Sequence, residues 1–120
     1  MSPKSALRTR DYLSHILEAI SLIEQYVLGM SEADFMNDRK TQDAVIRNLE
    51  IIGEAANNVL RVAPEFAAAH PDVPWEDAYL LRNQIAHGYF KVDCKIVWQT
   101  ILQDLPERHQ RISLLHESRC

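Results

Sequence analysis

The run from Val45 to Ala63, VIRNLEIIGEAANNVLRVA, decides the fold class of this 120-residue chain. Its apolar residues recur at alternating steps of four and three without a break: Val45, Leu49, Ile52, Ala56, Val59 and Ala63. Steps of three and four return to the same face of an α-helix, so the run predicts a helix with one apolar seam packed against another helix. Pro64 follows directly and is expected to stop this helix, because proline has no backbone N–H to donate.

The residues before this run predict a second long helix. Its apolar stripe has the same spacing and ends near Gly29: Leu13, Ile16, Leu17, Ile20, Ile23 and Val27. Ser31 is then expected to cap the start of a further helix, with Asp34 three residues later as an acidic capping partner.

The residues after Pro64 predict a rigid loop and more helices. The loop is His70–Pro74, because its two prolines restrict the backbone, and Pro74 suits the first turn of a helix from about Trp75 to His87. That helix is expected to bury Ala78, Leu81 and Ile85. Asp93 is a candidate N-cap for a fifth helix carrying Ile96, Val97, Ile101 and Leu102, and Pro106 is expected to begin or kink a final helix with Ile112 and Leu115. No segment alternates at period two, so the sequence predicts an all-α, compact bundle of about five helices.

Composition indicates one globular domain, residues 1–120, in the cytoplasm. Hydrophobic residues make up 47% of the chain, and no stretch has the length of a membrane span or a signal peptide. The two cysteines, Cys94 and Cys120, form no paired pattern and are expected to be reduced. A formal net charge of -4 argues against binding of nucleic acid by bulk electrostatics, so any RNA contact must be local. The basic residues available for it are Arg47, Arg61, Arg82, Lys91, Arg108 and Arg111.

The segment LRNQIAHGYF, residues 81–90, gathers a fixed cation, a base and a phenol. The guanidinium of Arg82 suits phosphate oxygens, and His87 can exchange protons near neutral pH. Gly88 is typical of a helix end, which places Tyr89 on the turn after it. Asn83 and His87 are four residues apart and share a helical face, where the amide of Asn83 could orient the imidazole. Arg82 and His87 lie about 140° apart around an ideal helix, so two-fold packing of two chains would bring Arg82 of one near His87 of the other.

The pattern Arg82-x4-His87-x-Tyr89 resembles the signature of the HEPN superfamily of small helical ribonucleases, and the wider chain resembles the HepT toxin family. The resemblance runs from about residue 8 to about residue 106. It includes these segments: Asp11-Tyr12-Leu13 with Ile16, Ser31–Phe35, Arg47-Asn48, Gly53-Glu54-Ala55, Val73-Pro74-Trp75 and the stretch from Val92-Asp93 to Val97-Trp98.

This resemblance implies an all-α HEPN-like domain that pairs as a symmetric dimer, and a function as the toxin of a type VII-like toxin–antitoxin system. The implied activity is a metal-independent endoribonuclease without a cofactor, cleaving messenger or transfer RNA to a 2′,3′-cyclic phosphate. Arg82 and His87 would be catalytic, with Asn83 and Tyr89 in support. The implied partner is an MntA-like nucleotidyltransferase that silences the toxin by adding AMP to Tyr89, although simple masking of the cleft is an alternative.

Each candidate residue also has a structural interpretation. Arg82 and His87 could cap a helix end, and Tyr89 could be a half-buried aromatic residue beside Phe90. Arg47 and Glu54 could form a structural ion pair, or Glu54 could pair with Arg82. The remaining histidines, His15, His70, His109 and His116, have no zinc-site spacing. The alternatives for the whole chain are a non-catalytic RNA- or nucleotide-binding module and a structural partner of the nucleotidyltransferase.

Overall fold

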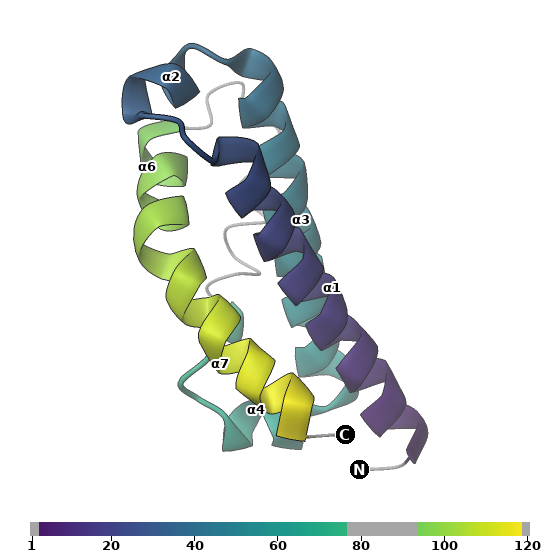
Figure 1. Ribbon diagram of the computed structural model, residues 1–120. Helices are drawn as coiled ribbons and strands as arrows, with labels where there is room; N and C mark the ends of the chain where they lie inside the picture. Colours follow the sequence, from purple (N-terminus) through teal and green to yellow (C-terminus); the bar gives the residue numbers. More distant parts are fainter. Residues whose placement is uncertain (1–2, 77–93, 119–120) are drawn as a thin grey trace.

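The computed structural model describes residues 3–76 and 94–118, and these residues form helices joined by short turns (Figure 1). The elements in chain order are α1 (Pro3–Val27), α2 (Glu32–Met36), α3 (Arg39–Val62), α4 (Pro64–Ala69), α6 (Cys94–Gln99), the π-helix η1 (Thr100–Asp104) and α7 (Leu105–Ser118). Within the described ranges there is no strand, and none of the helices there is long and apolar enough to cross a membrane. The prediction of an all-α fold is confirmed.

The two longest helices, α1 and α3, form an antiparallel pair, with α2 at the end where the chain reverses (Figure 1). The predicted seam of α3 is confirmed, since all six of its apolar residues are buried, Val45 and Val59 completely. The predicted stripe of α1 is confirmed in the same way, because Leu13, Ile20 and Ile23 are fully buried. Each stripe covers the other, which is how two amphipathic helices keep their apolar faces from water.

Side-chain caps fix the turns between α1 and α3. Gly29 has φ +79°, a backbone conformation that glycine adopts without a steric penalty. The predicted capping box is present, since the Ser31 hydroxyl accepts from the Asp34 N–H at 3.1 Å and the Asp34 carboxylate accepts from the Ser31 N–H at 3.0 Å. Asp38 caps α3 by accepting from the Thr41 N–H at 3.0 Å. This backbone hydrogen bond, assisted by the Thr41 hydroxyl, lowers the pKa of the Asp38 carboxyl below its usual range.

Pro64 ends α3 as predicted, but a short helix that the periodicity did not predict begins at once. Pro64 is the first residue of α4, where a missing N–H costs nothing because the first N–H groups of a helix have no partner within it. α4 buries Phe66 and Ala67 beneath the end of α3.

The C-terminal region is one continuous helical rod from Cys94 to Ser118, formed by α6, η1 and α7 (Figure 1). In its middle the N–H of Leu105 donates to the Thr100 carbonyl, five residues back, which makes a π-turn. Pro106 follows this bond, and a widened turn fits a proline that cannot donate to the residue four positions before it. We predicted that Pro106 begins or kinks a helix. The structure has a widened helical turn, Thr100–Asp104, just before it.

The rod packs against α1 through α7 and against α2 through α6. Val97, Ile101 and Leu105 are buried as part of the common core, and the Trp98 ring lies 5.2 Å from that of Phe35 on α2. The other two apolar residues named for this helix, Ile96 and Leu102, are 54% and 58% exposed. Each directly precedes or follows a core residue in sequence, and one step turns a helix by about 100°, away from the core.

Two serine–histidine hydrogen bonds join α7 to α1. Ser14 Oγ lies 2.9 Å from His116 Nε2, and Ser21 Oγ lies 3.5 Å from His109 Nε2. The two serines are seven residues apart, and so are the two histidines. Seven residues make about two helical turns, so the two hydrogen bonds repeat along the antiparallel contact between α1 and α7. Ile112 is buried between them in sequence, at 2% exposure.

Candidate functional site

The residues predicted to carry the chemistry, Arg82, Asn83, His87 and Tyr89, lie outside the described ranges. Their roles stay predictions. The structure does describe both flanks of the segment that contains them, which are the turn over residues 70–76 and the start of α6 at Cys94. The geometry of the candidate site is therefore built from these flanks.

The turn over residues 70–76 is closed by short-range hydrogen bonds. The N–H of Val73 donates to the His70 carbonyl at 3.2 Å, and the N–H of Trp75 donates to the Val73 carbonyl at 2.9 Å. The indole Nε1 of Trp75 also donates to the His70 carbonyl, at 3.2 Å. The rigid loop predicted from its two prolines is confirmed, and Trp75 and Glu76 begin a helical turn.

Trp75 anchors the turn in the core. Trp75 and Val73 are each 5% exposed, and the Trp75 ring lies 6.2 Å from that of Phe66 on α4. On its inner side the turn contacts α1, α3 and α7. Val73 and Trp75 line a small void together with Ile16, Ile52 and Ile112 from these three helices. The void has a volume of about 10 Å³, no more than one water molecule needs, so this region is packed core.

α7 holds the same turn from outside through Arg111. Its Nη1 donates to the main-chain carbonyl of Asp72, and its Nη2 pairs with the Glu107 carboxylate one helical turn earlier. The i,i+4 spacing of Glu107 and Arg111 could have indicated the ion pair. Nothing in the sequence points to the Asp72 carbonyl, which lies 39 residues away along the chain.

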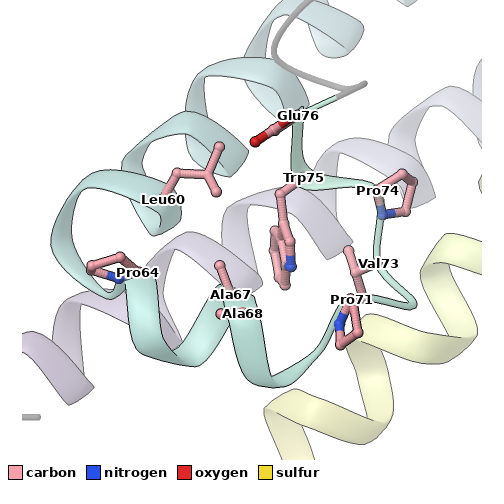
Figure 2. A pocket seen from close by; sticks show the side chains of 9 residues that line it. All are labelled: Leu60, Pro64, Ala67, Ala68, Pro71, Val73, Pro74, Trp75 and Glu76. Atoms are coloured by element: carbon pink, nitrogen blue, oxygen red, sulfur yellow. The ribbon is translucent and has the colours of Figure 1, made fainter.

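A groove of about 480 Å³ opens on the other side of Trp75 (Figure 2). Leu60, Pro64 and Ala67 form its wall on the α3 and α4 side, and Figure 2 shows the Trp75 ring at its centre. Among the described residues that line it, Glu76 at the rim is the charged one. These described residues therefore offer no cation to a phosphate backbone.

The polar face of α3 carries the other candidate residues. Arg47 lies 3.8 Å from the Glu50 carboxylate, one turn away, whereas the predicted partner Glu54 is two turns away, about 10 Å along the axis. Glu54 is exposed, and its alternative pairing with Arg82 stays a prediction. Asn48 is 6% exposed and donates to the Ala44 carbonyl at 2.9 Å.

Of the four basic residues considered for RNA contact that the structure describes, Arg47, Arg61 and Arg111 have local partners. The Arg61 guanidinium donates to Asn58 at 2.6 Å, and Arg108 lines the small void under the turn. Arg111 is engaged as described above. Lys91 lies outside the described ranges, as does Arg82.

The histidines outside the motif contact aromatic rings or serines. His15 lies 6.3 Å from the Tyr12 ring and His70 lies 4.7 Å from the Phe66 ring, while His109 and His116 contact α1. Across residues 3–76 and 94–118, no three His, Cys, Asp or Glu side chains group as a metal site would require.

The fold and the flanks together define a class: a small all-α protein in which an Arg-x4-His-x-Tyr segment joins a buried tryptophan turn to a C-terminal helical rod. Comparison with known families agrees with this class. Residues 16–115 match the family described as "Ribonuclease HepT-like", and the chain belongs to this HepT-like family. The matched range includes the motif and both of its flanks.

Relatives named as probable or putative ribonucleases match most of the chain. A protein from Thermococcus cleftensis named "Probable ribonuclease HepT" is 44% identical over 97 residues, 81% of this chain and 86% of that protein. A "Putative RNase" from Caldanaerobacter subterraneus subsp. tengcongensis is 39% identical over 103 residues, 86% of this chain and 89% of that protein. No solved structure gave a significant match.

Proposed function

We propose that this protein is an endoribonuclease, the toxin of a toxin–antitoxin pair, and that it acts on messenger or transfer RNA in the cytoplasm. The observation that carries the proposal is the presence of Arg82, His87 and Tyr89, at the spacing of the HEPN motif, inside the range that matches the HepT-like family. The names of the relatives, which are called ribonucleases, support it.

The proposed reaction is a transesterification that needs no metal. The ribose 2′-oxygen bonds to phosphorus as the bond from phosphorus to the 5′-oxygen breaks, leaving a 2′,3′-cyclic phosphate and a 5′-hydroxyl. His87 takes the 2′-hydroxyl proton or delivers a proton to the 5′-oxygen, and Arg82 stabilises the charge that develops on the phosphorane. Asn83 supports the imidazole, and Tyr89 lines the cleft. In a symmetric dimer, His87 of one chain acts with Arg82 of the other.

The proposed partner is an MntA-like nucleotidyltransferase that adenylylates Tyr89. AMP on this phenol adds bulk and negative charge where RNA phosphate has to bind, so it excludes the substrate and repels it. Incubating the purified pair with ATP is expected to raise the intact mass of the toxin by one AMP, and Tyr89→Phe is expected to prevent this. Inhibition of Tyr89→Phe by the partner without a mass change would instead indicate masking of the cleft.

The deciding experiment first measures the intact mass of the purified protein, to show that Tyr89 is unmodified. It then measures RNA cleavage by this protein in the presence of EDTA. His87→Ala and Arg82→Ala are each expected to lower kcat by about 100-fold or more, the usual contribution of a general acid–base group. His15→Ala is the matched control, because His15 is exposed on α1 and contacts the Tyr12 ring.

The ends of the products identify the chemistry. Cyclic phosphate ends, formed by the wild type and His15→Ala and absent with His87→Ala, would support the proposal. Cleavage that needs a divalent cation would contradict the metal-independent mechanism. Binding of RNA without cleavage would favour a non-catalytic binding module.

A further inference from the structure

The turn over residues 70–76 is held from two sides just before the motif. From inside, Val73 and Trp75 are buried against α1, α3 and α7. From outside, Arg111 of α7 reaches the Asp72 carbonyl. Only six residue steps separate Glu76, the last described residue, from Arg82. The position of this turn therefore sets where the segment with the proposed catalytic residues begins.

The contact made by Arg111 is suited to fixing the path of the chain. Its acceptor is a main-chain carbonyl, so the bond constrains the backbone of the turn whatever side chain residue 72 carries. The guanidinium is planar, and the second nitrogen is held by Glu107 on the same helix. Glu107 thus orients the group that reaches across to Asp72.

We propose that Arg111 is a positioning residue for the proposed RNA cleavage, because it ties the turn before the motif to the C-terminal rod. This inference rests on the proposed function. Transfer of phosphorus between two oxygens depends on alignment of the reacting groups, and a misplacement of about 1 Å can cost about 100-fold in rate. Arg111 does not contact the reacting atoms in this proposal; it acts through the turn that leads to Arg82 and His87.

The test compares Arg111→Met and Arg111→Lys with the matched control Arg39→Met. Arg39 also forms an i,i+4 ion pair, with Asp43 at 3.7 Å, but on α3 and without a contact to the turn. Arg111→Met keeps an unbranched apolar stem and lacks the guanidinium, so it removes the hydrogen bonds to Asp72 and Glu107. It is expected to lower kcat by about 10- to 100-fold, with KM for RNA changed by less than about threefold. Arg111→Lys, which retains a donor, should recover part of the rate, and Arg39→Met should match the wild type.

Two further readouts separate positioning from a general loss of structure. Thermal unfolding gives the folded fraction of each variant, so rates are expressed per folded molecule. Hydrogen exchange at the Val73 and Trp75 amides should be faster in Arg111→Met than in the wild type, since both amides donate within the turn.

Each result has a defined meaning. An active wild type with an equally active Arg111→Met, or a loss that disappears after correction for folded fraction, would overturn this inference alone. Unchanged exchange at both amides would also overturn it, because the turn would then not depend on Arg111. A wild-type chain that does not cleave RNA would overturn the proposed function and this inference with it.

Discussion

Single polar residues fix the places where this chain changes direction. Asp38 illustrates how, because its half-buried carboxylate caps α3 through the Thr41 N–H and hydroxyl, at 3.0 and 2.9 Å. These hydrogen bonds favour the ionised carboxylate and lower its pKa. A carboxyl with a lowered folded-state pKa stabilises the fold above its unfolded pKa, and the contribution is lost as the pH falls through the folded value.

We expect Asp38→Ala to lower the melting temperature at pH 7, because the cap is lost. The difference between wild type and Asp38→Ala should shrink below about pH 4, where the carboxylate becomes protonated. Asp38→Asn keeps an acceptor that does not titrate, so its advantage over Asp38→Ala should be similar at pH 7 and pH 3. Melting curves followed by circular dichroism would check this. A wild-type advantage that persists undiminished at pH 3 would contradict the assignment.

Among the elements, the sequence predicts best what depends on local signals, which are the period of the apolar residues, a capping serine and a proline. The seams of α1 and α3, the Ser31 cap and the end of α3 at Pro64 are all confirmed. α4 was missed because a six-residue helix is too short to show a period. The sequence does not distinguish the exposed Ile96 and Leu102 from the buried Val97 and Ile101, because apolar type does not say which side of a helix meets the rest of the molecule.

The candidate site is less predictable for a related reason. Its chemistry was predicted from three residues close together in sequence, but its supports come from residues far away. The contact between Arg111 and the Asp72 carbonyl spans 39 residues, and a backbone acceptor leaves no trace in the sequence. Arg47 pairs with Glu50 because i,i+3 neighbours on a helix are close, whereas Glu54 is one turn too far.

The contact between α1 and α7 gives a prediction at this scale. Ser14→Ala should lower the free energy of unfolding by about 0.5–1.5 kcal/mol, the usual net contribution of a hydrogen bond. Ser21→Ala should have a smaller effect, because its distance to His109 is 3.5 Å, against 2.9 Å between Ser14 and His116. Urea unfolding of both variants would test the order. A larger effect for Ser21→Ala would show that the Ser14 bond is not the stronger of the two.

At the scale of the whole molecule, the two proposed catalytic residues, Arg82 and His87, are five positions apart in sequence, which on the helix predicted there would place them about 140° apart. We expect the protein to be a dimer in which Arg82 of one chain acts with His87 of the other. Light scattering on the purified protein should therefore give twice the chain mass.

Mixing inactive variants tests whether the two residues act across the dimer. Arg82→Ala and His87→Ala should each be inactive alone. A mixed dimer retains one pair of Arg82 and His87 on opposite chains, so unfolding and refolding them together should restore up to about a quarter of the wild-type activity, from half the dimers with one of two sites each. Refolding each variant separately is the control. No recovery from a mixture shown to contain mixed dimers would place both residues in the same chain.

The continuous rod from Cys94 to Ser118 also fixes the distance between two of its anchor points. The segment with the motif follows the turn that Arg111 holds and precedes Cys94, the first residue of the same rod. Cys94 and Arg111 are seventeen residues apart along the rod. At 1.5 Å per residue these two points of the rod are about 26 Å apart. The separation of these two anchor points on the rod is thus set by helical rise. A residue inserted into the rod between Cys94 and Arg111 would change that separation directly.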